Sequence, residues 1–405
     1  MTDRTTLIHP FSDLSKSEGD FINIVSAEGS TLTDDRGKQY LDGMASLWYC
    51  QVGHGRREII DAVCNQMNEL AVYNTFDPFT NDRAREASDL IADKSPLPDG
   101  RVFLGCSGSE AVDTALKIAR IVQQRRGRPD KQIILRRTHG YHGTNFGGTS
   151  AQGIAPNRDG WGDLVPHFIE VPNDNIEEAA KVFAEHGANI AAVISEPVQG
   201  AGGVWPPQDG YLQGLRRLCT DNDALLIFDE VICGFGRTGS WFASQTFGVT
   251  PDLMTFAKGV TSGYQPLSGV VVSREVGEEL TEPGFLLRTG YTYSGHPAAA
   301  AAAVANINLI EAEGLVERAN HIGKKTAEGL DALAADGIIV DYRGVGGVWG
   351  ANIGRDAVPI KNAMLDAGVI VRGVGEGILW CPPLIITDEE IGQFIETLGN
   401  CMVGS

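Results

Sequence analysis

The middle of the chain alternates short apolar runs with longer stretches that have helical spacing. The apolar runs are rich in β-branched residues and are bounded by Gly, Pro, Asp or Asn, which is typical of buried strands. Helical patterns separate most of them, for example at 109–126 and 210–223. This alternation predicts an α/β fold with a mostly parallel, seven-stranded sheet. The seven expected strands lie at 101–107, 131–137, 167–172, 190–197, 224–230, 252–258 and 267–273.

The two ends of the chain have a different pattern. Residues 21–43 predict a hairpin-like pair of strands around the turn "DDRG" at 34–37. After Pro297 a helical pattern, which includes a run of alanines, continues to about residue 320, and mixed α and β segments follow. We therefore expect a large domain and a smaller α/β domain made from both ends of the chain. The expected limits are 46–295 for the large domain, and 1–45 with 296–405 for the smaller one.

Strand polarity is predictable at one place. The strands expected at 252–258 and 267–273 are joined by only a short loop. A parallel connection needs a crossover of a dozen residues or more, so one of these two strands is expected to run antiparallel.

Composition narrows the range of functions. The 405 residues carry a formal net charge of -19, which argues against a nucleic-acid partner because phosphate binding needs clustered Lys and Arg. The seven cysteines are scattered without a CxxC pair, which favours a reducing compartment. The first residues lack the apolar core of a signal peptide, and no apolar run approaches the roughly 20 residues of a membrane span. We therefore expect a cytoplasmic protein that contacts no membrane.

Charged side chains stand where expected strands end. Glu196, Asp229 and Lys258 each come at the end of an apolar run. Ligands of open α/β sheets bind outside the carboxyl ends of the strands, so these residues predict one shared pocket. An internal salt bridge between Asp229 and Lys258 is the structural alternative.

Two other motifs suggest ligands. Ser107, Gly108 and Ser109 stand between a strand and a helix, where free N–H groups and the helix dipole favour an anion. An ordinary serine N-cap followed by Glu110 explains the same residues. The pair His139 and His142 has no neighbouring carboxylate or cysteine, so no metal site is predicted.

The stretch "GFGRTG" at 234–239 matches a dinucleotide-binding pattern and follows a strand. A nicotinamide-dependent dehydrogenase is therefore a competing function. However, Asp229 and Glu230 come between the strand and the glycines, and no acidic residue ends a strand about 20 residues later. The pattern is therefore disfavoured as a nucleotide site.

Several blocks together resemble the class III aminotransferases, which have pyridoxal phosphate fold type I. They are "SGSEAVDTALKIAR", "GYHG", "SEPVQGAGG", "LLIFDEVICGFGRTG", "PDLMTFAKGVTSGYQPLSGVVVS" and "GYTYSGHPAAA", in the order of the family and over nearly the whole chain from about Leu41. The resemblance implies that Lys258 forms a Schiff base with the cofactor and then moves protons. It also implies that Asp229 pairs with the pyridine nitrogen, with Tyr141 and Val231 on the two ring faces and Glu196 nearby.

The same resemblance implies a homodimer with shared active sites, with a tetramer left open. Gly108 and Ser109 would hold the phosphate of their own subunit. Thr292 matches a residue that reaches the phosphate of the neighbouring subunit. Each site would then need two chains.

Details of the blocks favour the ω-amino acid and amine:pyruvate aminotransferases within the family. Trp48 and Phe76 would line the substrate pocket with Tyr141, and Arg372 would bind the carboxylate of a keto acid such as pyruvate. Asp77 stands where relatives often have a second aromatic residue, which suggests smaller or charged amino donors. The implied reaction is a ping-pong transamination. An ornithine- or GABA-type aminotransferase, an aminomutase or a decarboxylase is the alternative, and a non-catalytic regulator is disfavoured.

Overall fold

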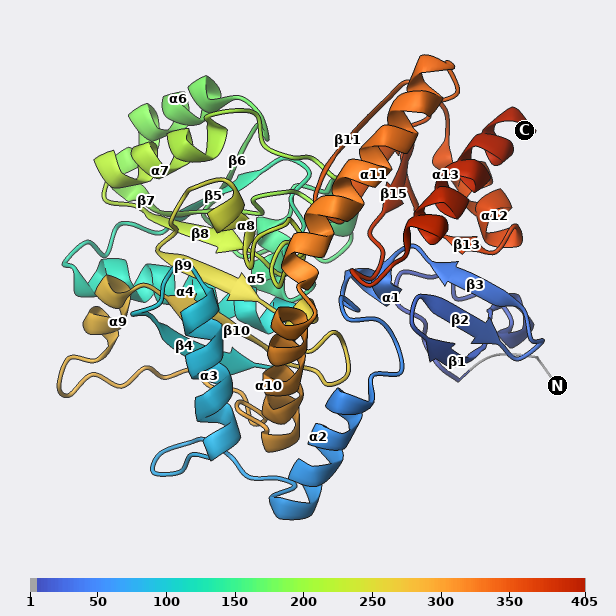
Figure 1. Cartoon of the computed structure of the whole chain (residues 1–405). Coiled ribbons are helices and arrows are strands. Elements are labelled where there is room, and N and C mark those ends of the chain that lie inside the picture. Colours follow the sequence, from blue (N-terminus) through green and yellow to red (C-terminus); the bar gives the residue numbers. More distant parts are fainter. Residues whose placement is uncertain (1–5, 405) are drawn as a thin grey trace.

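A seven-stranded sheet forms the centre of the larger part of the molecule, in a computed structural model that describes residues 6–404 (Figure 1). The strand order is β4-β10-β9-β8-β7-β5-β6. The central strands β7, β8 and β9 are buried along their whole length, as continuous apolar runs require. The bounds are β4 (Arg101–Gly105), β5 (Ile133–Arg137), β6 (Phe168–Val171), β7 (Ile190–Ser195), β8 (Leu225–Asp229), β9 (Leu253–Phe256) and β10 (Ser268–Val272).

The sheet is parallel except at one strand. β10 runs antiparallel to both of its neighbours, β4 and β9, whereas β5 to β9 pair in parallel. The predicted seven strands and the predicted antiparallel pair are therefore confirmed. Since β7, β8 and β9 run in the same direction, their carboxyl ends meet at one edge of the sheet.

Helices cover both faces of this sheet. Alternate residues of β8 show the division, because Ile227 packs in the apolar cluster with α4 while Leu226 and Phe228 pack with α6 and α7. The helices of this part of the chain are α2 (Arg57–Glu69), α3 (Asp82–Lys94), α4 (Gly108–Arg125), α5 (Phe146–Ala151), α6 (Ile176–His186), α7 (Tyr211–Asp221), α8 (Ala243–Thr246) and α9 (Arg274–Leu280). Short 3-10 turns η2 (Ala155–Asn157), η3 (Gly187–Asn189) and η4 (Lys258–Val260) complete it.

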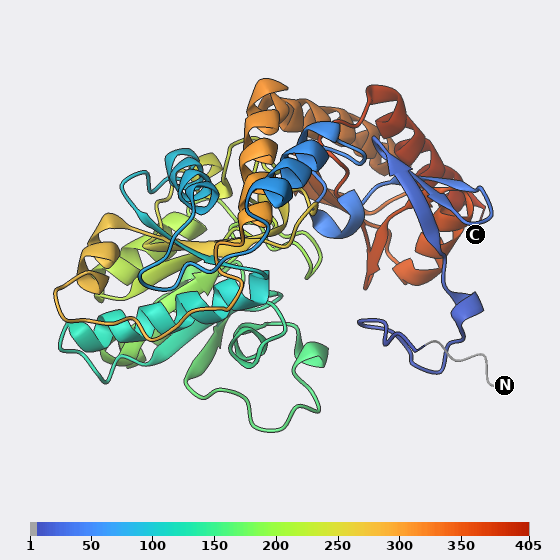
Figure 2. The ribbon, with the colours of Figure 1, turned by 90° about the horizontal axis from the view of Figure 1, so that it is seen from below.

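Strands from both ends of the chain form a second region, where the blue and red segments lie side by side (Figure 2). One sheet has the order β1-β2-β3-β13, and β13 pairs with β3 through Val369 and Leu41. The predicted hairpin around 34–37 is present as the antiparallel pair of β2 and β3. The other sheet has the order β11-β12-β15-β14. We propose that this region is the smaller domain, with the limits 1–45 and 296–405.

The remaining elements belong to this region or connect it to the large sheet. The strands are β1 (Ile24–Glu28), β2 (Thr31–Asp34), β3 (Gln39–Asp42), β11 (Asp341–Val345), β12 (Val348–Asn352), β13 (Val369–Ile370), β14 (Arg372–Val374) and β15 (Gly377–Trp380). The helices are η1 (Glu18–Asp20), α1 (Ala45–Trp48), α10 (Pro297–Ala312), α11 (Leu315–Ala335), α12 (Ala357–Asp366) and α13 (Asp388–Val403).

The helix predicted from Pro297 to about residue 320 is wrong in its length. α10 ends at Ala312, and α11 starts after Gly314, whose φ of +60° is in the left-handed region that glycine tolerates. Over residues 6–404, no single helix combines the length and apolar composition of a membrane span. α10 and α11 meet these criteria only as a pair, which is bent by 62°.

Candidate active site

Three neighbouring strands bring charged side chains to one edge of the large sheet. Asp229 is the last residue of β8, Glu196 directly follows β7, and Lys258 follows β9 after one intervening residue. Because β8 lies between β7 and β9 and runs parallel to both, these ends are adjacent. The structure therefore brings together the three residues for which the strand ends predict a shared pocket.

The Lys258 ammonium group has no hydrogen bond or ion pair to any residue between 6 and 404, although the Lys258 carbonyl oxygen accepts a backbone hydrogen bond from Thr261. Burial lowers the pKa of its ammonium group, although the charges of Asp229 and Glu196 act in the opposite direction. Its φ of +49° lies in the left-handed region, which is costly for a non-glycine residue and is found most often at functional sites. No salt bridge to Asp229 is formed, so the structural alternative to a pocket is not observed. A lysine of this kind is available as a nucleophile or base.

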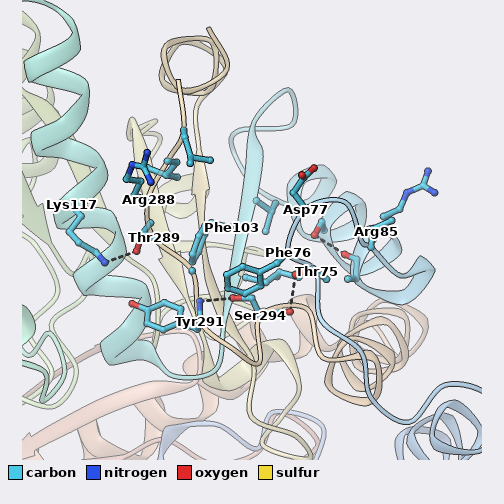
Figure 3. Close-up of a pocket in the computed structure, with 18 of the residues that line it drawn as sticks. Thr75, Phe76, Asp77, Arg85, Phe103, Lys117, Arg288, Thr289, Tyr291 and Ser294 are labelled. Atoms are coloured by element: carbon cyan, nitrogen blue, oxygen red, sulfur yellow. Dashed lines mark hydrogen bonds between the residues drawn. The ribbon is translucent and has the colours of Figure 1, made fainter. Parts of the chain in front are cut away.

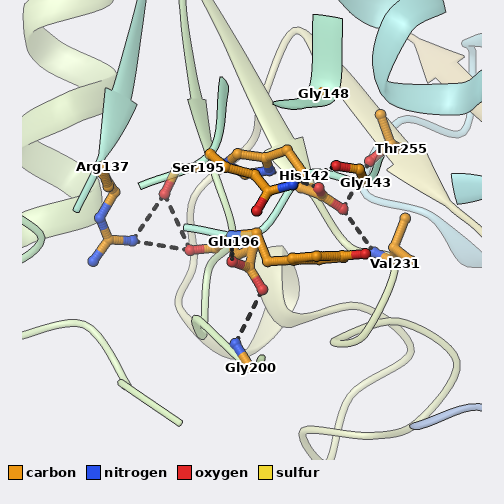
Figure 4. A network of polar contacts seen from close by, with 12 residues as sticks. Arg137, His142, Gly143, Gly148, Ser195, Glu196, Gly200, Val231 and Thr255 are labelled. Atoms are coloured by element: carbon orange, nitrogen blue, oxygen red, sulfur yellow. Dashed lines mark hydrogen bonds and ion pairs between the residues drawn. The ribbon is translucent and has the colours of Figure 1, made fainter. Parts of the chain in front are cut away.

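Asp229 is held by three donors. One carboxylate oxygen lies 2.8 Å from Nδ1 of His142, and the other accepts hydrogen bonds from Thr255 Oγ1 at 3.0 Å and from the backbone N–H of Val231 at 3.2 Å (Figure 4). Asp229 and His142 are almost fully buried. Nε2 of His142 has no hydrogen-bond partner among the described residues. In the sequence, His142 was noted only with His139 as a possible metal-binding pair. Its contact with Asp229 was therefore not predicted.

Glu196 fixes the backbone beside Asp229. Its carboxylate accepts hydrogen bonds from the N–H groups of Tyr141 at 2.8 Å and Gly200 at 3.0 Å (Figure 4). Burial raises the pKa of Glu196 to about 7, and the nearby His142 opposes this shift. Glu196 therefore acts on the site through Tyr141, whose loop it holds.

A second buried carboxylate, Glu230, follows Asp229 directly. It accepts hydrogen bonds from the N–H groups of Ala243 at 2.8 Å and Ser244 at 2.7 Å. Burial raises its pKa to about 7. Sequence reasoning did not identify this residue as an anchor, although its position beside Asp229 was visible. Glu230 ties the end of β8 to α8 and so fixes the segment that carries Val231.

The first turn of α4 leaves two backbone N–H groups without a partner. Ser107 and Glu110 form a reciprocal capping box, with Ser107 Oγ accepting from the Glu110 N–H at 3.2 Å. This box leaves the N–H groups of Gly108 and Ser109 without an acceptor among residues 6–404. A Cβ on Gly108 would lie 3.1 Å from Val231 Cγ1. The N-cap is therefore present, and the two N–H groups beside it, which suit an anion, lie close to Val231.

The loop of Tyr141 closes on the same turn. The N–H of Thr144 donates to Ser109 Oγ at 2.9 Å. Gly143 has φ of +89°, and a Cβ there would lie 2.5 Å from Ser109 Oγ, so only glycine permits this close approach. These contacts place the loop, α4 and Val231 around one space.

These groups match the parts of pyridoxal phosphate. The free N–H groups of α4 suit a phosphate, the buried Asp229 suits a protonated ring nitrogen, and the unpartnered Lys258 suits an aldehyde carbon. The unpartnered Nε2 of His142 leaves one buried polar atom at this site without a protein partner. The residues therefore fit the cofactor that the sequence implies.

Arg372 and Trp48 lie in different surroundings. Arg372 in β14 is exposed, and its guanidinium group has no hydrogen bond or ion pair to any described residue. Partial burial lowers the pKa of this group, and Tyr141 lies near it. Trp48 is 2% exposed and packs in an apolar cluster with Val198 and Ile232. The geometry leaves Arg372 free to bind an anion, whereas Trp48 lies behind the pocket surface in this arrangement.

Phe76 and Thr292 are not part of the cluster around Lys258. Phe76 lines a separate cavity of about 1000 Å³, together with Asp77 and the loop 286–291 (Figure 3). Both Phe76 and Thr292 are exposed. No contact from either residue reaches Lys258, so within one chain the predicted site residues fall into two groups.

Comparisons with known proteins give a consistent result. The family described as "Aminotransferase class-III" matches residues 14–402. The putrescine–pyruvate aminotransferase of Pseudomonas aeruginosa is 36% identical over 97% of this chain and 93% of its own length. An (S)-enantioselective ω-transaminase from Thermomicrobium roseum has a TM-score of 0.94 and 35% identity, over 98% of this chain and 96% of that one. A PLP-bound amine transaminase from an uncultivated Pseudomonas species has a TM-score of 0.93 and 32% identity, and covers 99% of both chains.

Proposed function

The chain belongs to the class III aminotransferases, which depend on pyridoxal phosphate, and from this premise we propose that it moves an amino group from an amine or ω-amino acid to pyruvate. The observation that carries the proposal is the meeting of Asp229, Glu196 and the unpartnered Lys258 beside the free N–H groups of α4. This arrangement combines a proton-transferring amine with sites for a ring nitrogen and for a phosphate.

When bound, pyridoxal phosphate supplies an aldehyde carbon and a ring that accepts electrons. Lys258 would hold this group through its amine and would carry a proton to and from the substrate carbon, for which its lowered pKa is suited. Asp229, oriented by His142 and Thr255, holds a proton at the ring nitrogen.

Other residues orient the reactants in this proposal. Tyr141 and Val231 flank the ring from opposite sides, with Tyr141 held by Glu196. Gly108 and Ser109 bind the phosphate through their free N–H groups. These residues fix the position of the reacting carbon relative to Lys258.

Arg372 is the proposed carboxylate site. Its guanidinium group has no protein partner within the described chain and lies near Tyr141, so a keto acid would satisfy it by a bidentate pair. A long side chain on β14 can also turn toward water when the substrate is an amine without a carboxylate. One pocket can thus accept both substrates of a ping-pong reaction.

The amino donor is proposed to be small or positively charged. Asp77 is exposed at the cavity beside Phe76, and no described residue pairs with its carboxylate. A second ammonium group on the donor would be attracted to it. The relative that acts on putrescine supports a diamine as one such donor. Phe76 would contribute apolar surface, and Trp48 would support the pocket wall from behind.

We propose a homodimer with shared sites because Phe76 and Thr292 lie outside the cluster around Lys258 of their own chain. They could contact a cofactor or substrate only at the Lys258 of a second chain. The segments around them expose many large apolar side chains, which is unusual for a free surface. They include Met67, Leu70, Val72, Tyr73, Phe76, Phe79, Leu286 and Tyr293. Burial of this surface against a second copy would bring Thr292 to the partner's site. We leave a tetramer open.

We also propose a cytoplasmic location. All seven cysteines are free thiols, four of them buried, which supports a reducing compartment.

A donor screen tests the function. The holoenzyme is incubated with single amines, diamines and ω-amino acids, with pyruvate as the acceptor, and alanine formation is measured against a blank without acceptor. Alanine formation with at least one amine or ω-amino acid is expected. Alanine formation with α-amino acids only, or product formation in the blank, would refute the proposed substrate class.

A further inference from the structure

The loop before Thr292 is attached to α4 of its own chain. Tyr291 Oη donates to the carbonyl oxygen of Glu110 at 3.0 Å and lies 3.1 Å from Thr114 Oγ1. Lys117 Nζ donates to Thr289 Oγ1 at 2.6 Å in the same region (Figure 3). Glu110 belongs to the first turn of α4 and Thr114 to the next. The loop is therefore bonded to the part of α4 that offers its free N–H groups to an anion.

The Tyr291 ring is also held in place. It packs edge-on against Phe103 with 6.1 Å between ring centroids, and its N–H donates to Ser294 Oγ at 3.3 Å. The next two residues differ. Thr292 is exposed and has no hydrogen bond to any residue between 6 and 404, and Tyr293 is also exposed. A fixed residue thus directly precedes two that project from the protomer.

We propose that Tyr291 is a positioning residue that couples the two cofactor sites of the dimer, an inference that rests on the proposed function. One end of the coupling is the first turn of α4, where Gly108 and Ser109 bind the phosphate of their own chain. The other end is Thr292, which contacts the phosphate of the partner subunit. Tyr291 connects the two ends within one chain.

The physical basis of the coupling is the order of the first helical turn. A phosphate on the free N–H groups of α4 restricts this turn, because it supplies acceptors that the turn otherwise lacks. The carbonyl oxygen of Glu110 is then held more firmly, and so is the Tyr291 hydroxyl bonded to it. Thr292 is presented in one orientation at a lower entropic cost. The second phosphate therefore binds more tightly than the first.

The coupling is tested on apo-dimers titrated with pyridoxal phosphate, with binding followed by cofactor absorbance and by calorimetry. Dimer integrity is checked by light scattering at the same concentration. The wild-type chain is expected to bind the second equivalent about five-fold more tightly than the first, or better. The variant Tyr291→Phe keeps the ring and removes the hydroxyl. It should lose most of this difference and bind the second equivalent about three- to ten-fold more weakly.

Three variants make the test specific. Thr114→Val removes the hydroxyl that contacts Tyr291 Oη, and it should change the titration in the same direction as Tyr291→Phe. Tyr342→Phe is the matched control, because it removes a tyrosine hydroxyl that bonds Asp331 on the surface, and it should titrate as wild type. Thr292→Ala should weaken the binding of both equivalents.

The outcomes separate the inference from its premise. A Tyr291→Phe titration equal to wild type, alongside a weakened Thr292→Ala, overturns the coupling and leaves the shared site intact. A Thr292→Ala titration equal to wild type overturns the cross-subunit contact and the coupling together. Two independent, equal sites in the wild-type dimer would also overturn the coupling.

Discussion

Two lysines of this chain have an ammonium pKa lowered by burial but differ in their hydrogen-bond partners. Lys131 is 6% exposed, and its ammonium donates to the carbonyl oxygens of Gly187, Ile190 and Asn222 at 3.0, 3.1 and 2.6 Å. The Lys258 ammonium has no such acceptor in the part of the chain that the structure describes. Burial lowers the pKa of both ammonium groups. The position of the pKa alone therefore does not distinguish a structural lysine from a reactive one.

The difference lies in the acceptors. The carbonyl oxygens of Gly187 and Asn222 belong to the caps at the carboxyl ends of α6 and α7, so Lys131 adds a charged donor to acceptors at both helix ends. Lys258 is placed beside the carboxylates of Asp229 and Glu196 but is bonded to neither. An ammonium group whose hydrogen bonds are all made to the protein stabilises the fold. One that has no acceptor in the protein can instead bind or react with a ligand.

The largest effect is expected for Lys258→Ala. Turnover should fall about 10⁴-fold, at the upper end of what a proton-transferring group contributes, because the variant loses both the attachment point and the proton carrier. The free energy of unfolding should not fall, since no hydrogen bond is lost. Single-turnover rates and urea denaturation measure the two quantities. Borohydride reduction followed by peptide mapping of the wild-type holoenzyme should label Lys258, and a label on another lysine would contradict the assignment.

Asp229→Asn tests whether a carboxylate that already has three hydrogen-bond partners in the protein also takes part in catalysis. A neutral amide cannot hold a proton on the ring nitrogen, so kcat should fall about 10²- to 10³-fold, as for other groups that stabilise charge in a transition state. Asp252→Asn is the matched control. Asp252 accepts from the Leu226 N–H at the other end of the strands and should affect stability only. A rate for Asp229→Asn near wild type would remove Asp229 from the mechanism.

Arg372→Ala extends the comparison to a guanidinium group that, like the Lys258 ammonium, has no partner among the described residues. Loss of one charge-assisted carboxylate pair should cost about 1.5–3 kcal/mol, or about ten- to a hundred-fold in kcat/KM for pyruvate. The half-reaction with a simple amine should change little. Stopped-flow measurement of each half-reaction separates the effects. Equal losses in both halves would show that Arg372 is structural.

Lys131→Met is the reciprocal of the first experiment. Three carbonyl oxygens lose the ammonium donor, and the free energy of unfolding should fall by about 1–3 kcal/mol. Turnover of the folded enzyme should stay at the wild-type value. Lys325→Met, at a partly exposed lysine that pairs with Glu328, is the control and should be neutral. A loss of turnover in folded Lys131→Met would break the distinction between the two lysines.

The smallest effect is expected for Asp77, an unpartnered carboxylate on the cavity rim. Asp77→Asn removes the charge but keeps the shape, and should lower kcat/KM for a diamine about two- to five-fold while leaving a monoamine unchanged. Asp77→Phe should in addition raise the rate with a bulky aromatic amine. Equal effects of Asp77→Asn on diamine and monoamine would show that its charge does not select the donor.

Several features could be read from the chain because they depend on local patterns. Apolar runs and their boundaries located the seven strands, and the short loop after Lys258 indicated that one of the two strands it joins runs antiparallel, which the structure shows to be β10. Placement of Asp229 and Lys258 at adjacent strand ends followed from the same runs and the general behaviour of parallel sheets. The alanine run predicted a buried helix, but the break at Gly314 was missed, since helical spacing continues through it.

Other features depend on residues that only the folded chain brings together. His142 and Asp229 are 87 residues apart in sequence, and Lys131 binds carbonyl oxygens up to 91 residues away. No local pattern encodes such pairs, because the spacing along the chain does not determine distance in the fold. The sequence by itself thus determined the strands, the position of Lys258 at a strand end and the family blocks. Only the tertiary structure decided which lysine is satisfied, which histidine orients Asp229, and that Thr292 lies away from the Lys258 of its own chain, because these depend on packing between distant segments.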